Sequence, residues 1–299
     1  MKPITIYTGA TGLNTVDDPV RIGFNKNGQT DLGVAVNIEI DQSLRVTRRK
    51  GQTLLQSGAY HSLFCDGGDC FVVKGTSLYQ VASNGSLKGI RSGLTPGKMS
   101  FAQSGDRTYY ANGYETGWIE DGISNVWQVG TFVGPDTNRI FSDLIIGDHL
   151  SVFSGRIFVS EGNILWWSEP YDFGLFNKAE SFVQFHTEIL MIKPVAAGMF
   201  LSTEENTYFL AGVNPRAWQS VRVCSFPAVE WSEAIEYVDG GDIGFDPGLS
   251  ALWASPEGAI LGSQGGQIIN ITKEKIIYPE TAKTGFGCLI GYQFLHGLK

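Results

Sequence analysis

Six acidic residues are the first candidates for chemistry, because two carboxyl groups that face one cavity can cleave a glycosidic bond. They are Glu161, Glu169, Asp172, Glu204, Glu205 and Glu257. Most of them fall in segments typical of turns, where Asp and Glu solvate the bend of the chain. We therefore predict no catalytic residue, and we expect that the protein is not an enzyme.

The four histidines could bind a metal only if other ligands lay close to them in the chain or the fold. They are His61, His149, His186 and His296, and none has a metal-ligand neighbour at position i+2 or i+4. His61 and His149 begin corresponding segments of two repeats, which favours a structural role. The chain also has no Gly-x-Ser-x-Gly nucleophile motif and no phosphate-binding Gly-rich motif. We predict neither a metal site nor a cofactor.

An acidic, glycine-rich segment over residues 239–246 could offer three carboxylates to calcium, namely Asp239, Asp242 and Asp246. Their spacing does not match an EF-hand loop. A plain acidic loop is the better interpretation of this pattern.

Cys65 and Cys70 flank a Gly-Gly turn, so the two side chains should face each other across two strands. A disulfide is geometrically conceivable there, but we expect reduced thiols, as in a cytoplasm. Cys224 and Cys288 are each isolated in the sequence and do not supply further zinc ligands.

Seven residues are candidates for contacts with partners. Arg48 and Arg49 belong to the only basic cluster, which is either a phosphate contact or a solvated strand end. Trp218 and Trp231 lie outside the regular pattern and are either core residues or interface anchors. Asp17, Asp18 and Arg21 lie in a polar segment near the N-terminus.

The elements that position these side chains are predicted by a sequence pattern that recurs five times. Each copy has an apolar run, a Gly-containing turn, a second apolar run, another turn and a third run rich in aromatic residues. The copies cover residues 61–81, 99–120, 150–167, 191–210 and 249–271. Asn-Gly and Gly-Gly between alternating runs are strong signals of hairpins. Each copy therefore predicts a meander of antiparallel strands.

The repeat favours an all-β, β-propeller-like fold with about five or six blades, because blades of four strands need roughly 40–50 residues each. Equivalent aromatic or apolar positions in successive copies are 39 to 60 residues apart. A β-sandwich and an elongated β-array are the alternatives. We expect one domain over residues 1–299, with residues 8–32 as an extended arm or loop and residues 212–233 as an insertion between blades. Strands from both chain ends, at 4–7 or 34–40 and at 289–295, would share the closing sheet.

Composition excludes some functional classes. The formal net charge is −8, so a basic surface that clamps nucleic acid is not expected. The first residues lack the apolar core of a signal peptide, and no apolar stretch is long enough for a membrane span. We expect synthesis in a cytoplasm.

Three segments together resemble virion propeller proteins of tailed bacteriophages. Residues 36–51 resemble their lead-in of the form Asn-apolar-x-apolar-Asp…Arg-x-x-x-Gly, and residues 155–176 resemble their repeat that ends in Ser-(Glu/Asp)-Pro. Residues 258–272 resemble their late blades. Such proteins are nozzle, tail-hub or DNA-stabilising components of short-tailed phages. The resemblance implies a ring-forming virion subunit without catalytic activity.

We therefore expect a structural subunit of a phage tail or head–tail junction, made in the host cytoplasm and located in the virion. Its expected partners are further copies of itself in a homo-oligomeric ring, other tail or portal-proximal proteins, and DNA in passing contact. The alternatives are a glycan-binding or glycan-cleaving propeller for host attachment and a bacterial interaction propeller unrelated to phages.

Overall fold

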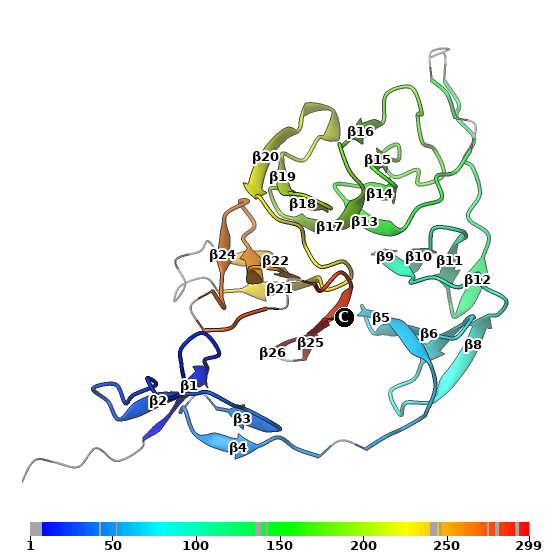
Figure 1. Cartoon of the computed structure of the whole chain (residues 1–299). Helices are drawn as coiled ribbons and strands as arrows, with labels where there is room; N and C mark the ends of the chain where they lie inside the picture. The colour runs from blue at the N-terminus through cyan, green and yellow to red at the C-terminus, as the bar shows by residue number, and fades with distance from the viewer. Residues whose placement is uncertain are drawn as a thin grey trace, which may run out of the picture.

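The computed structural model describes residues 8–298 apart from residues 42, 52, 135–138, 142, 240–243, 245–246, 274, 279–280 and 291–292. Five four-stranded antiparallel sheets stand around a ring, so the chain is a five-bladed β-propeller (Figure 1). This confirms the predicted fold class, gives five as the number of blades and excludes the sandwich. The only helix in the described part of the chain is the short 3-10 helix η1 (Pro215–Ala217).

Each blade is a meander in chain order. Blade one holds β5 (Tyr60–Asp66), β6 (Asp69–Lys74), β7 (Ser77–Val81) and β8 (Leu87–Arg91), and blade two holds β9 (Ser100–Ser104), β10 (Arg107–Ala111), β11 (Thr116–Glu120) and β12 (Ile123–Asn125). Blade three holds β13 (His149–Phe153), β14 (Arg156–Glu161), β15 (Ile164–Trp167) and β16 (Phe182–Gln184). Blade four holds β17 (Ile189–Val195), β18 (Gly198–Thr203), β19 (Thr207–Ala211) and β20 (Gln219–Cys224), and blade five holds β21 (Ala234–Val238), β22 (Gly248–Ser255), β23 (Gly258–Gly262) and β24 (Ile268–Asn270).

The turns form where the sequence places glycine. Gly67 and Gly68 have φ angles of 57° and 96° between β5 and β6, a backbone region that glycine enters without steric cost. The turn brings Cys65 opposite Cys70, as the sequence predicts. Their sulfur atoms are joined in a disulfide, so the expectation of reduced thiols is wrong for this pair.

The core lies between neighbouring blades, because the strands present apolar side chains on both faces of each sheet. On β14, Ile157 and Val159 pack toward Tyr109 of blade two, whereas Phe158 between them packs toward Met199 of blade four. This period of two is what a strand buried on both faces requires. Radial packing of this kind leaves only short edges exposed.

The gap between blades five and one holds a C-terminal hairpin of β25 (Gly285–Ile290) and β26 (Gln293–Leu298), whose end lies near the centre of the ring (Figure 1). Leu298 packs against the cluster that contains Val229 and Tyr278, and Lys98 Nζ donates a 2.7 Å hydrogen bond to the carbonyl oxygen of Gly285. The predicted strand at 289–295 is thus part of a hairpin. Its expected partner at 34–40 pairs elsewhere, and the one at 4–7 lies outside the described residues.

Two small sheets precede the propeller and lie outside the ring (Figure 1). Strands β1 (Gly9–Leu13) and β2 (Gln29–Leu32) pair in parallel, and β3 (Ile38–Ile40) pairs with β4 (Val46–Arg48). We call residues 8–48 the N-terminal module. Lys275 Nζ ties it to the chain after blade five through hydrogen bonds of 3.2 Å to the carbonyl oxygen of Thr11 and 2.8 Å to Asp31 Oδ1. Residues 8–32 therefore include paired strands rather than forming only an extended arm.

Residues 212–233 contain η1 and β20, and β20 is the fourth strand of blade four. The side chain of Asn214 caps η1 by accepting a 3.2 Å hydrogen bond from the backbone N–H of Arg216. Much of the segment expected as an insertion thus belongs to the regular architecture of the blade.

A candidate functional site at the mouth of the ring

Several charged side chains lie at one end of the ring. Strand β13 lies beside both β9 and β17, and all three begin at this end, just after Lys98, Asp148 and Glu188. The turn after β18 returns to the same end, where the backbone N–H of Glu204 donates to the carbonyl oxygen of Glu188 at 3.0 Å. We call this end the mouth and assign to it Lys98, Asp148, His149, Glu188, Glu204, Glu230 and Trp231.

His149 is the buried centre of the mouth, with only 2% of its surface exposed. Its Nε2 lies 3.5 Å from Oε1 of Glu230 and makes no hydrogen bond within the described residues. Its ring lies 4.4 Å from the ring of Trp231. The backbone N–H of His149 donates to Ser160 Oγ at 3.1 Å, which fixes the start of β13.

Two carboxyl groups of the mouth have pKa values above their ordinary range. Burial is the main cause of the raised pKa of Asp148, with a smaller contribution from the charge of Glu230. Burial also raises the pKa of Glu188, and Glu204, Asp148 and Glu230 add to it by like-charge repulsion. His149 opposes both shifts. The mouth therefore has a negative potential that favours positively charged groups over anions.

Trp231 contacts both His149 and Lys98, which precede or begin the first strands of two blades. Its backbone has a φ of 66°, which is uncommon for a residue other than glycine, so its conformation is imposed by its surroundings. Lys98 Nζ lies 5.6 Å from the centre of the indole ring, within the range of a cation–π contact. The neighbouring Glu230 is fixed by β25, because its carbonyl oxygen accepts a 2.8 Å hydrogen bond from the backbone N–H of Gly285.

The other candidate residues do not reach the mouth. Asp17 accepts a 2.9 Å hydrogen bond from Asn14, and Asp18 caps the turn that contains Arg21. All three residues are exposed on the N-terminal module, as are Arg48 and Arg49 at the end of β4.

Trp218 lies between blades three and four, where its ring stacks on Phe158 at 5.3 Å. Of the two tryptophans outside the regular pattern, only Trp231 thus belongs to the mouth.

Among the carboxylates first considered for glycoside cleavage, Glu204 and Glu205 lie in the turn after β18, and the charge of Glu204 acts on Glu188. Glu161 accepts a hydrogen bond from Trp166 Nε1 at 2.9 Å, and Glu169 pairs with Arg139 at 3.4 Å. Sequence reasoning missed Asp148, Glu188 and Glu230. Their one signal is their position directly before or near the first strand of a blade, since these starting points converge in any propeller.

The described residues contain no group of three or more His, Cys, Asp and Glu side chains that could hold a metal ion. Of the three carboxylates considered for calcium, Asp242 and Asp246 lie outside the described residues, and Asp239 is exposed. In the described part of the chain, no helix has the length and apolar character needed to cross a membrane.

The chain matches no protein-family model and no curated protein. Among solved structures it is similar to a gluconolactonase from Xanthomonas campestris, at 11% identity and a TM-score of 0.48, over 77% of this chain and 80% of that one. It is also similar to virginiamycin B lyase from Staphylococcus aureus, at 11% identity and a TM-score of 0.49, over 77% and 75%. It spans 30% of the extracellular domain of a hybrid two-component system from B. thetaiotaomicron, at 10% identity and a TM-score of 0.48. The similar structures thus include two enzymes, whose substrates have no bearing on this chain at such low identity.

Proposed function

We propose that this chain is a non-enzymatic structural subunit of a tailed-bacteriophage virion, at the tail or the head–tail junction, and that it assembles as a homo-oligomeric ring. The propeller provides a stiff body, and the N-terminal module provides the contact with a neighbouring copy. The resemblance of residues 36–51, 155–176 and 258–272 to virion propellers supports this assignment.

The observation that carries the proposal is a group of exposed apolar side chains on the N-terminal module and on the chain that leads from it to blade one. Val20 is 92% exposed and Leu54 is 78% exposed. The whole group consists of Val16, Val20, Phe24, Val34, Val36, Leu54 and Leu55. Burying one leucine side chain contributes about 1.5–3 kcal/mol relative to leaving it in water. A subunit that covers these residues with a neighbour gains this energy at every contact of a closed ring.

Charge adds complementarity between copies. Arg48, Arg49 and Lys50 are exposed beside the apolar group, whereas the mouth carries clustered carboxylates. In a head-to-tail ring, two different surfaces of the subunit meet at each contact, so opposite charges on one chain favour association. The net charge of −8 also keeps DNA from adhering to a passage that the ring would surround.

The test is the size and location of the full-length protein. We expect sedimentation and negative-stain electron microscopy at micromolar concentration to show closed rings, and mass spectrometry to find the chain in purified phage particles. Replacing both Leu54 and Leu55 with Ser should shift the ring toward monomer. The matched control replaces Ile123 and Val126 with Ser, since these are two largely exposed apolar residues in and directly after the last strand of blade two. A protein that stays monomeric and is absent from particles would contradict the proposal.

A further inference from the structure

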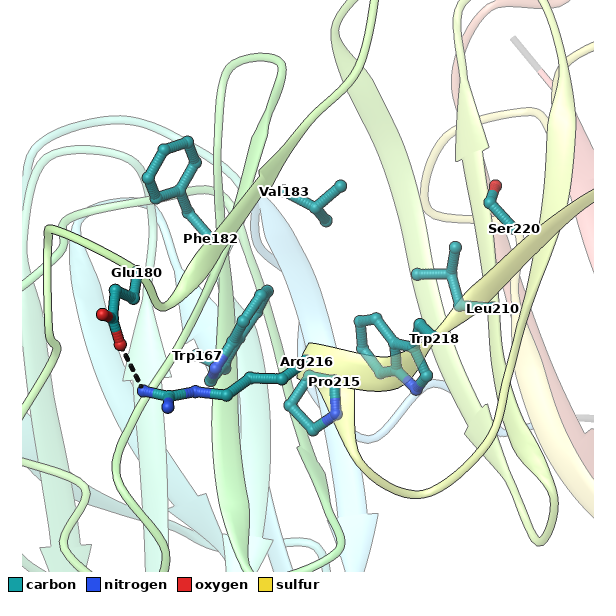
Figure 2. Close-up of a pocket in the computed structure, with 9 residues that line it drawn as sticks. All are labelled: Trp167, Glu180, Phe182, Val183, Leu210, Pro215, Arg216, Trp218 and Ser220. Carbon is teal, nitrogen blue, oxygen red and sulfur yellow. Dashed lines mark ion pairs between the residues drawn. The ribbon is translucent and has the colours of Figure 1, made fainter.

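An open pocket of about 410 Å³ lies between blades three and four, away from the mouth. Its walls come from β15 and β16 on one side and from β19, η1 and β20 on the other (Figure 2). The volume falls in the range of about 300–1,000 Å³ that is typical of small-molecule sites. The pocket belongs to this chain alone and does not depend on assembly.

Aromatic side chains form the apolar part of the pocket. Trp218 is held rigidly, because one face of its ring stacks on Phe158 and its Nε1 donates a 2.7 Å hydrogen bond to the carbonyl oxygen of Gly212. Trp167 meets it edge-on at 6.0 Å. Phe182 is 39% exposed at the opposite wall and packs on Trp166 at 5.1 Å. Preformed aromatic surfaces of this kind bind flat, partly apolar ligands with little loss of side-chain entropy.

Charged groups stand at one side of the same pocket (Figure 2). Arg216 Nη2 lies 3.0 Å from Glu180 Oε2, and this pair joins η1 of blade four to the segment before β16 of blade three. Both side chains are about half exposed, so they keep donors and acceptors available to a ligand. The hydrogen bond from the backbone N–H of Arg216 to the side chain of Asn214 fixes the backbone from which the Arg216 side chain extends.

One polar group of the pocket wall lacks a partner. Trp167 is 3% exposed, and its indole N–H makes no hydrogen bond within the described residues. A buried donor without an acceptor costs about 1–3 kcal/mol. An apolar side chain from a partner would desolvate the Arg216–Glu180 pair without replacing its hydrogen bonds to water. The indole nitrogen itself has almost no exposed surface, so a ligand in the pocket makes its hydrogen bonds with the ion pair, and hydroxyl groups supply both donors and acceptors for it.

We propose that this pocket is a carbohydrate-binding site that takes a short segment of a glycan. A sugar ring presents C–H groups on its faces and hydroxyl groups at its rim. The faces stack on Trp218 and Phe182, and the rim hydroxyls hydrogen-bond Arg216 and Glu180. This activity goes beyond the structural role proposed above, because it gives the subunit a direct contact with a surface polysaccharide.

The test uses the purified full-length chain on an array of bacterial surface oligosaccharides. Ligand-observed NMR follows with glucose, galactose, mannose and N-acetylglucosamine as free probes. We expect binding to at least one oligosaccharide. Arg216→Ala and Glu180→Gln should each weaken this binding about tenfold while the melting temperature stays unchanged. Arg222→Ala is the matched control, because Arg222 is an exposed residue of β20 that does not line the pocket.

Phe182→Ala provides an aromatic variant whose folding is not at risk, since Phe182 lies on a short outer strand. It too should weaken binding. The proposal is overturned if no oligosaccharide binds, or if the three pocket variants bind as well as the Arg222 control. It is equally overturned if proline-rich or tryptophan-rich peptides occupy the pocket in the same NMR assay and no sugar does.

Discussion

Nε2 of His149 lies 3.5 Å from Oε1 of Glu230, and this pair connects the first strand of blade three to the segment that enters blade five. The two residues are 81 positions apart in the chain and do not belong to adjacent blades. Their contact, together with the ring of Trp231, links two parts of the mouth that come from non-adjacent blades.

Loss of the histidine should therefore weaken the whole propeller. We expect His149→Ala to lower the free energy of unfolding by about 2–4 kcal/mol, because it leaves a cavity beside Trp231 and removes the partner of a partly buried carboxylate. Urea denaturation followed by tryptophan fluorescence measures the change. His61→Ala is the control, since His61 is only partly buried and should cost less than half as much. Equal effects of the two substitutions would argue against a special role for the mouth.

The raised pKa of Asp148 predicts how stability depends on pH. The folded protein binds a proton at Asp148 more tightly than the unfolded chain does, so this group lowers stability as pH rises above its ordinary value of 3.8 and through the folded pKa. We expect Asp148→Asn to raise the melting temperature by about 1–2 °C at pH 7 and to have no such effect near pH 4. Calorimetry at the two pH values decides this. A variant that is less stable than the native protein at pH 7 would show that the carboxylate makes a favourable contact instead.

Cys224 should be inert in the folded protein. It is buried at the end of β20, and burial raises the pKa of its thiol to about 11. We expect iodoacetamide at pH 8 to leave it unmodified until denaturant is added, since only the thiolate reacts. Peptide mass spectrometry after labelling reads this directly. The same experiment without reductant should find Cys65 and Cys70 protected by their disulfide, and labelling of either before reduction would contradict the bond.

The start of blade three leaves no room for a larger residue at Gly147. A Cβ atom there would overlap the carbonyl oxygen of Ser160, which belongs to the backbone and cannot rotate away. We expect Gly147→Ala to cost about 2 kcal/mol or more of stability, because the backbone of β14 would have to shift to relieve the overlap. Gly265→Ala provides the comparison, because nothing lies within 4 Å of its added methyl group. Thermal unfolding of the two variants should differ by several degrees.

The blades could be predicted from the sequence because hairpins are local. Alternating runs around Gly67–Gly68 and Gly155 specify their own turns, and each predicted run became a strand. The fourth strands of blades one to four were missed since several, such as β12 and β16, have three residues and no distinct pattern. In blade five the three predicted runs are β22, β23 and β24, and the missed strand is the first, β21. The N-terminal module was missed because its parallel pair joins short polar segments about twenty residues apart.

The mouth could not be predicted in the same way. Asp148, Glu188 and Glu230 lie about 40 residues apart, and only the closure of the ring brings their loops together. Trp231 was a candidate for its residue type, but nothing in the sequence points to His149 as its neighbour. The facing of Cys65 and Cys70 followed from the turn, whereas their oxidation state did not.

The bonds from Lys275 to Thr11 and Asp31 have a consequence for the order of biosynthesis. On the ribosome, residues 8–48 emerge before the blades, yet this anchor emerges only after all five blades. The hairpin that fills the last gap follows later still. Contacts between such distant residues form slowly. A stalled or shortened nascent chain would thus carry its earliest strands without their anchor, as a ready substrate for chaperones and proteases.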